Sequence, residues 1–280
     1  MKAAEWEELL LVATEEVRRE VSPLAARGER GREVGVGAAG DRTIYADKLA
    51  EDVLLKEMEG VAGLRVLSEE AGDAGEAAGR TLAVVDPLDG SSNFVRGIPF
   101  YCTSVAVVDD TSARGVDGVE VGVVRDLVTG DVYSARRGKG AKKNGAPIRT
   151  AATARIADSV VGVDLSSAPA GLYPELEPLL GGIKRQMHLG ANALELCYLA
   201  EGKTDAFVDL RERMRITDFA AAGLIAAEAG AEVTDRGGGD LSLAFDLAHR
   251  FSFVASANPR IHGQVLERCG RSAARAPAGR

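Results

Sequence analysis

The alternation of apolar and polar positions predicts a chain of alternating helices and strands. Apolar residues recur at helical spacing over residues 6–26, which predicts an amphipathic first helix that weakens at Ser22-Pro23. A second helical pattern covers residues 45–59. Between the two, residues 28–40 are rich in glycine and charged side chains, so we expect a mobile loop there, and such loops often close binding sites.

Apolar runs of strand length follow the second helix. Two of them end directly before the acids Glu69 and Asp86. Further strands are predicted over residues 103–108, 119–124, 131–135, 159–163, 206–208 and 251–256, and further helices over 191–199, 218–229 and 259–268. This alternation favours an α/β (α+β) fold, with a soft boundary near Thr150 between an N-terminal half, residues 1–150, and a C-terminal half, residues 151–270.

Length, charge and cysteine content narrow the class of protein. The 280 residues are enough for one composite domain or two packed lobes. A formal charge of −8 argues against a nucleic-acid partner, because affinity for a phosphate backbone needs clustered Lys and Arg. Three scattered cysteines suit the reducing cytoplasm, and no apolar run approaches the ~18 residues of a membrane span. Residues 271–280, small and basic, are expected to form a disordered tail.

One stretch stands out chemically: residues 86–94, with the sequence Asp-Pro-Leu-Asp-Gly-Ser-Ser-Asn-Phe. It places two carboxylates three residues apart directly after a predicted buried strand. Gly90 lets the main chain approach a ligand closely, and Ser91 or Ser92 can cap a following helical turn. Carboxylates and main-chain amides that face one spot suit Mg²⁺ together with a phosphate. Taken alone, an ordinary Asp-Pro-x-Asp-Gly turn explains the pentapeptide equally well.

Two further acidic positions favour a metal site over a simple turn. Glu69-Glu70 follow another strand-like run, and Asp218 opens an apolar helical segment. In this order along the chain, Ser68-Glu69-Glu70, residues 86–94 and residues 217–221 resemble three motifs of the inositol monophosphatase superfamily of Mg²⁺-dependent, lithium-sensitive phosphatases. The resemblance covers nearly the whole chain. It implies a layered α/β/α/β/α sandwich with the active site between its two halves, most metal ligands in the N-terminal half, and a homodimer.

The resemblance also implies the composition of the active site. Two or three Mg²⁺ ions, for which Mn²⁺ can substitute, would be held by Glu69, Asp86, the main-chain carbonyl of Leu88, Asp89 and Asp218. Catalytic roles fall to Asp47, Glu69 and Ser91, with the Ser91 hydroxyl orienting a water molecule. Asp41 is the other upstream acid of this kind, and we favour Asp47. Ordinary structural roles, a loop end for Asp41 and a first helical turn for Asp47, explain these two acids as well.

The resemblance identifies the residues that contact the substrate less specifically than the metal ligands. By the same resemblance they are Gly90, Ser91, Ser92, Arg185, Gly190, Ala191 and Arg211. Arg211 stands where many inositol monophosphatases carry Glu, and Thr217 where they carry Trp; both departures resemble the archaeal branch that acts on inositol phosphates and on fructose 1,6-bisphosphate. Arg can bind a second substrate phosphate through a bidentate fork, although most Arg side chains only solvate the surface. The sequence therefore predicts a phosphomonoesterase for inositol 1-phosphate, fructose 1,6-bisphosphate or both.

Two alternatives stay open at this point. A 3′-phosphoadenosine 5′-phosphate phosphatase is the nearest enzymatic alternative, although aromatic residues, at 5%, offer few partners for stacking a base. A regulatory binding protein without turnover is the alternative from another class, because a fold alone does not establish a function. All the acids expected to bind metal are present, which argues against a pure binding role, since such a role does not need every one of them.

Overall fold

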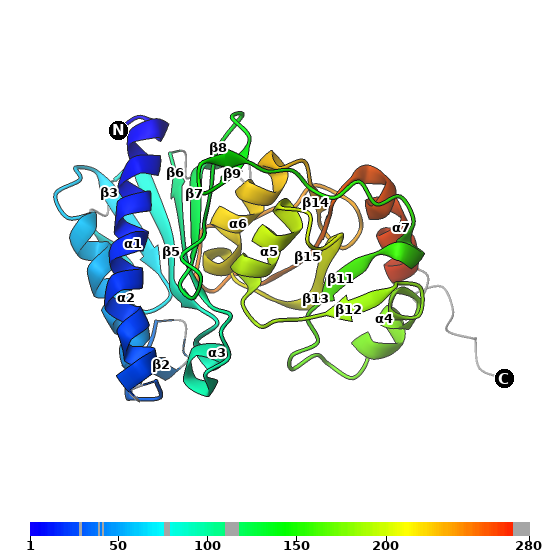
Figure 1. The fold of residues 1–280 in the computed structure, drawn as a ribbon, viewed down its shortest axis with the longest axis horizontal. Helices are drawn as coiled ribbons and strands as arrows, with labels where there is room; N and C mark the ends of the chain where they lie inside the picture. The colour runs from blue at the N-terminus through cyan, green and yellow to red at the C-terminus, as the bar shows by residue number, and fades with distance from the viewer. Residues whose placement is uncertain (28–29, 39, 41, 76–78, 110–117, 271–280) are drawn as a thin grey trace.

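In the described part of the chain, an eight-stranded and a five-stranded β-sheet alternate with three helical layers (Figure 1). The computed structural model describes residues 1–27, 30–38, 40, 42–75, 79–109 and 118–270. Helices α1 (Ala3–Arg27) and α2 (Tyr45–Glu57) cover the outer face of the first sheet. Helices α5 (Asn192–Ala200) and α6 (Ile216–Glu228) lie between the sheets, and α4 (Leu172–Leu180) with α7 (Pro259–Gly270) cover the outer face of the second sheet. This order confirms the predicted α/β/α/β/α fold.

The first sheet is mixed and has the strand order β10-β9-β8-β7-β6-β5-β3-β4. Its strands are β3 (Leu64–Ser68), β4 (Gly72–Gly75), β5 (Thr81–Asp89), β6 (Cys102–Val108), β7 (Val119–Asp126), β8 (Val132–Arg136), β9 (Ala141–Lys143) and β10 (Ala146–Pro147). In β5, Leu82 and Val84 belong to the core formed with α5 and α6, whereas Ala83 and Val85 belong to the core formed with α1 and α2. Both faces of β5 are therefore buried, which explains its uninterrupted apolar run.

The second sheet has the strand order β12-β11-β13-β15-β14. Its strands are β11 (Val160–Val163), β12 (Arg185–Met187), β13 (Ala206–Met214), β14 (Glu232–Thr234) and β15 (Phe251–Ser256). β13 pairs in parallel with β11 and antiparallel with β15. Although α5 and α6 follow Thr150 in the chain, they pack against the first sheet, so one core continues across the boundary. The division into residues 1–150 and 151–270 therefore stays a prediction.

Some segments differ from the prediction. Within residues 28–40, β1 (Glu33–Val36) pairs antiparallel with β2 (Arg42–Ile44), where we expected only an irregular loop. All four residues of β1 are exposed, so the strand has no buried face, and its four-residue alternation Glu-Val-Gly-Val is too short to mark it within a glycine-rich segment. The sequence pattern also misses α4, which carries Pro178 inside the helix. Asp41 and residues 271–280 lie outside the described residues.

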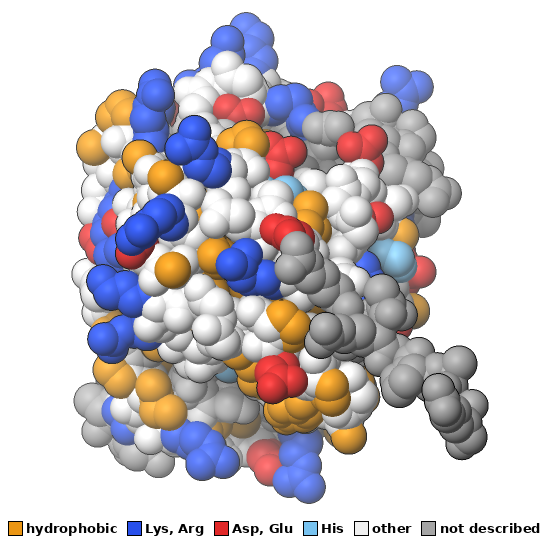
Figure 2. Space-filling view, turned by 90° about the vertical axis from the view of Figure 1, so that its right-hand side faces the viewer, with side chains coloured by type: hydrophobic (Ala, Val, Ile, Leu, Met, Phe, Trp, Pro, Cys, Tyr) orange, Lys and Arg blue, Asp and Glu red, His pale blue; other side chains and the backbone are white. Residues whose placement is uncertain are grey.

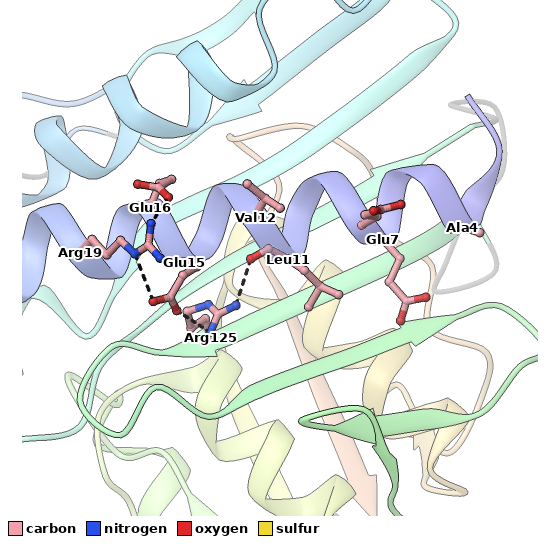
Figure 3. A pocket seen from close by; sticks show the side chains of 9 residues that line it. Ala4, Glu7, Leu11, Val12, Glu15, Glu16, Arg19 and Arg125 are labelled. Carbon is pink, nitrogen blue, oxygen red and sulfur yellow. Dashed lines mark hydrogen bonds and ion pairs between the residues drawn. The ribbon is translucent and has the colours of Figure 1, made fainter.

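A buried arginine fixes α1 on the first sheet (Figure 3). Arg125 of β7 donates hydrogen bonds to the Leu11 carbonyl oxygen at 3.0 Å and to Thr14 Oγ1 at 3.1 Å, and it pairs with Glu15 at 2.9 Å. The main-chain oxygen of Leu11 keeps its helical role while accepting this extra donor. A cavity along this side of α1 is lined by Leu11, Glu15 and Arg125, together with the exposed Val12.

The outer surface of the second half carries mixed charges. Figure 2 shows Lys and Arg side chains scattered among acidic and small apolar areas on this face. Among the helices of the described residues, none is both long and apolar enough to cross a membrane.

Candidate active site

An acidic cleft of about 400 Å³ opens where β3 and β5 end. Because these two strands are parallel neighbours, their carboxyl ends meet at the same edge of the sheet. The cleft brings together most of the sequence-predicted residues: Asp47, Glu69, Asp86, Leu88, Asp89, Gly90, Ser91, Ser92, Gly190 and Asp218. Segments from both halves of the chain therefore build a single cavity.

A local irregularity in β5 directs the two motif acids into the cleft. Asp86 pairs with Ser104 and Asp89 with Cys102, so three steps along β5 match two steps along β6. Such an extra residue bends a strand and changes the direction of its side chains. Pro87 supplies no N–H at this point, and its carbonyl oxygen accepts a hydrogen bond from Thr103 Oγ1 at 2.8 Å. The Asp-Pro-x-Asp sequence thus forms a bulged strand end.

Gly90 ends this strand because the next turn admits only glycine. Its φ is 91°, in the left-handed region. A Cβ atom at this position would lie 3.0 Å from the Phe100 carbonyl oxygen and 3.1 Å from the Ala191 side chain. The short helix α3 (Ser91–Arg96) begins directly after it. Ala191 is buried behind this turn, so its side chain packs against Gly90 and does not line the cleft.

Three acids from three elements converge in the cleft. Carboxylate oxygens of Glu69, Asp86 and Asp218 lie within 4.8 Å of one another. Glu69 follows β3, Asp86 lies in β5 and Asp218 lies in the first turn of α6. Burial, and then the charge of Asp218, raises the pKa of Glu69 above its usual range, while the Arg215 guanidinium, which pairs with Glu69, opposes the shift. Burial, and then the charges of Glu69 and Asp218, raises the pKa of Asp86.

This donor set fits a hard divalent cation. It consists of oxygen atoms alone, as Mg²⁺ prefers, and the acids that line the cleft outnumber its two arginines, Arg42 and Arg215. Burial is the main cause of these raised pKa values and neighbouring negative charges add to it, so a bound cation would favour the ionised carboxylates.

Asp89, the second acid of the Asp-Pro-Leu-Asp motif, is bound by the first main-chain amides of α5. Asp89 is 6% exposed and accepts hydrogen bonds from the main-chain amides of Asn192 at 3.2 Å and Ala193 at 2.7 Å. Burial and the charge of Asp218 raise the pKa of Asp89, and these two amides work against the shift. The positive end of a helix dipole thus faces this carboxylate.

Asp47 lies at the start of α2 and connects to the motif through Ser91. It accepts a hydrogen bond from the Ile44 amide at 2.9 Å, and the Ser91 hydroxyl lies 2.9 Å from its other oxygen. Ser91 Oγ also lies 2.8 Å from the Leu88 carbonyl oxygen, so its proton can serve either acceptor. Burial raises the pKa of Asp47 to about 7, against these hydrogen bonds. Asp47 can therefore exchange a proton near neutral pH.

A second cavity, of about 540 Å³, adjoins the acidic cleft and shares Arg215 and Asp218 with it. It is lined by four arginines, Arg211, Arg213, Arg215 and Arg250, with Ser166, Ser167 and Glu212. Arg211 is held by Asp209 at 2.7 Å and also pairs with Asp164. Below we call this space the arginine cavity.

Arg185, like Ala191, is a predicted substrate contact whose side chain does not line the site. It is exposed on β12, an edge strand of the second sheet, and it lines neither the acidic cleft nor the arginine cavity. The reason is topological, because the order β12-β11-β13 puts a whole strand between Arg185 and the arginines of β13. We therefore leave Arg185 out of the proposal below.

Sequence reasoning missed two residues that position the site. Glu51 is buried and accepts hydrogen bonds from Ser68 Oγ at 2.6 Å and the Ala71 amide at 2.7 Å, which fixes the turn that carries Glu69. Asn192 contacts both Asp89 and Asp218. For Asn192 a signal existed, since Asn is a common residue at the start of a helix. Nothing in the local pattern marks Glu51.

Comparison with known proteins agrees with the architecture described above. The sequence matches the Inositol monophosphatase family over residues 4–273. A fructose-1,6-bisphosphatase/inositol-1-monophosphatase of Methanothermobacter thermautotrophicus is 35% identical over 94% of this chain and 95% of its own. A bifunctional NADP phosphatase/NAD kinase of Methanococcus maripaludis is 32% identical over 92% of this chain and 48% of its own. A crystal structure of an inositol monophosphatase–fructose 1,6-bisphosphatase superposes with a TM-score of 0.84 at 30% identity, covering 96% of this chain and 100% of the other. The chain therefore belongs to the inositol monophosphatase family.

Proposed function

We propose that this protein is a Mg²⁺-dependent phosphomonoesterase acting on fructose 1,6-bisphosphate, on inositol 1-phosphate or on both. The observation that carries the proposal is the convergence of Glu69, Asp86 and Asp218 beside the arginine cavity. An oxygen-only metal centre next to a basic cavity suits a substrate with one phosphate at the metals and a second anion nearby. The names of the archaeal relatives agree with this substrate class.

The residues of the cleft divide into metal ligands and proton carriers. We propose that two or three Mg²⁺ ions are held by Glu69, Asp86, the Leu88 carbonyl oxygen, Asp89 and Asp218, with Mn²⁺ able to substitute. When bound, such ions neutralise phosphoryl oxygens and lower the pKa of a coordinated water. The Ser91 hydroxyl orients the attacking water, and Asp47, through its contact with Ser91, accepts the proton. The main-chain amides of Gly90, Ser91 and Ser92 are expected to donate to the phosphate, with Gly190 at the edge of the cleft.

The arginine cavity bears on the choice of substrate. Arg211 is held between two acids, so it forms a fixed part of the wall, whereas Arg213 is exposed at the opening. Fructose 1,6-bisphosphate would place its second phosphate here, and inositol 1-phosphate has none. The pyrophosphate of NADP⁺ has matching chemistry, and relatives named NADP phosphatases make that dinucleotide the second candidate.

The proposal also includes a homodimer and a cytoplasmic location. Analytical ultracentrifugation of the purified protein tests the homodimer.

The deciding experiment is a side-by-side assay of phosphate release. Inositol 1-phosphate, fructose 1,6-bisphosphate, NADP⁺ and 3′-phosphoadenosine 5′-phosphate are each incubated with the protein, with Mg²⁺ and with a chelator. We expect Mg²⁺-dependent release, with the largest kcat/KM for fructose 1,6-bisphosphate. Release from none of the four would contradict the proposal and favour a binding role. A preference for either nucleotide would retain the reaction class and replace the substrate.

A further inference from the structure

Asn192, the first residue of α5, contacts two acids of the cleft that come from different halves of the chain. Its main-chain amide donates to Asp89 Oδ1 at 3.2 Å, and its side-chain Nδ2 donates to Asp218 Oδ2 at 3.2 Å. Asp89 belongs to β5 of the first sheet and Asp218 to α6. One residue therefore connects the two carboxylates directly.

The position of Asn192 is fixed by its surroundings. The preceding turn is anchored by Glu195, whose Oε1 accepts the amides of Leu189 at 2.9 Å and Gly190 at 3.0 Å. The next residue, Ala193, is fully buried and donates its amide to Asp89 Oδ2 at 2.7 Å. Asn192 thus starts a helix that cannot shift without moving the Asp89 carboxylate.

The orientation of the Asn192 side chain follows from its partners. The side-chain nitrogen faces Asp218, which is the orientation that an ionised carboxylate requires, since it only accepts hydrogen bonds. The other end, Oδ1, is buried and has no hydrogen-bond partner among the described residues. Leaving an acceptor unsatisfied carries a cost, and here the gain on the opposite side is a bond to a charged carboxylate.

We propose that Asn192 is a positioning residue of the metal centre, holding Asp89 and Asp218 in the mutual arrangement in which both bind a divalent cation. This inference rests on the proposed metal centre and adds a residue to it. Partners that orient metal-binding carboxylates commonly change metal affinity by about 10- to 100-fold when they are removed. Asn192 itself touches neither substrate nor metal in this role.

The competing explanation is that Asn192 only stabilises the start of α5. A capping role would affect the stability of the protein equally with and without metal. A positioning role would affect metal affinity separately from stability. The two explanations therefore differ in a quantity that can be measured without turnover.

The test is Mn²⁺ binding followed by electron paramagnetic resonance of the free ion, for the wild-type protein and for Asn192→Ala. The substitution keeps the main-chain bond to Asp89 and removes only the bond to Asp218. We expect Mn²⁺ binding weakened about 10- to 100-fold, with kcat within about threefold of wild type once the metal is saturating. Asn192→Ser, which keeps a helix-starting residue too short to reach Asp218, should show the same loss and covers the case in which Asn192→Ala does not fold.

Asn144→Gly is the control, because Asn144 has a φ of 51°, which glycine adopts without strain, and its side chain also accepts a bond from the Val132 amide. Asn144 makes the same kind of amide-to-carboxylate bond, to Asp131 at 2.8 Å, on the surface and outside the cleft. It should change thermal unfolding equally with and without Mn²⁺ and leave Mn²⁺ affinity unchanged. Unaltered Mn²⁺ affinity in folded Asn192→Ala, or a kcat loss that persists at saturating metal, would overturn the inference. A wild-type protein that binds no Mn²⁺ would instead overturn the metal centre itself.

Discussion

Two groups of buried acidic side chains lie close together in this protein, and their negative charges are balanced in different ways. In the first, Asp164, Asp209 and Glu195 surround Arg211 and His188: Arg211 pairs with both aspartates, and His188 lies 2.9 Å from Glu195 and 3.3 Å from Asp164. Burial works against the charge of Arg211, but Asp209 and Asp164 outweigh it and raise its pKa. Basic side chains of the protein itself thus pair with these acids.

In the acidic cleft the balance is different. Glu69, Asp86, Asp89 and Asp218 share the space with Arg215, which pairs with Glu69, and the pKa of each of these four acids is raised. Burial is the main cause of each shift, and the charges of neighbouring acids add to it for Glu69, Asp86 and Asp89. Raised carboxyl pKa values of this kind gather at functional sites. The first cluster is therefore balanced by basic side chains of the protein, whereas the second is the one for which we propose an external cation.

The largest expected effect is on turnover. Asp89→Asn and Asp218→Asn each remove a charge proposed to bind metal, so we expect kcat/KM to fall by about 10³-fold or more, since removing one preorganised electrostatic contact commonly costs 10²- to 10³-fold. Steady-state kinetics with circular dichroism as a check on folding measures this. Near-normal activity in either variant would rule out the proposed mechanism.

The next effect contrasts the stability of the two groups. Asp209→Asn takes a fully buried partner from Arg211 and should lower the free energy of unfolding by about 2 kcal/mol. Asp86→Asn, measured in a chelator, removes a buried carboxyl whose ionisation is disfavoured by burial and by the neighbouring acids, so it should not lower the free energy of unfolding. Urea unfolding of both variants tests the contrast. Equal losses would show that the two groups are compensated alike.

Stability should also depend on pH and Mg²⁺ together. Asp47 has a pKa of about 7 in the folded protein and about 4 when unfolded, so between these values the folded state binds more protons. The free energy of unfolding without metal should therefore fall as pH rises from about 4 to about 7, and the raised pKa values of the other cleft acids act in the same direction. Thermal unfolding at pH 5.5 and 8 should show a larger Mg²⁺ stabilisation at pH 8. A stabilisation independent of pH would contradict this account.

The smallest effect concerns the substrate. Arg213→Ala removes an exposed guanidinium at the arginine cavity and should raise KM for fructose 1,6-bisphosphate about tenfold, the scale of one charge-assisted hydrogen bond, while inositol 1-phosphate is unaffected. Arg185→Ala removes an exposed guanidinium that lines neither cavity and serves as the control. Equal effects of both variants, or equal effects on both substrates, would remove the arginine cavity from the account of specificity.

The sequence by itself determined the architecture and the acids that the cleft brings together. The strand runs before Glu69 and Asp86 and the helix that begins near Asp218 were readable because buried strands and helix starts leave strong local patterns. Weak local patterns were not readable: β1 is fully exposed, and α4 contains an internal proline. β5 and β13 also extend beyond their predicted ends: β5 continues through Asp86 to Asp89, and β13 continues beyond residue 208 to Met214.

Only the tertiary structure decided which charges meet. Asp89 lies 103 residues from Asn192, and Arg215 lies 146 residues from Glu69, so no local pattern could pair them. Arg185 and Arg211 were both expected to contact the substrate, yet the strand order separates Arg185 from the site, and Arg211 pairs with two acids. The physical reason is that periodicity reports which face of an element is buried, whereas charge compensation depends on neighbours that only the packed sheets and helices bring together.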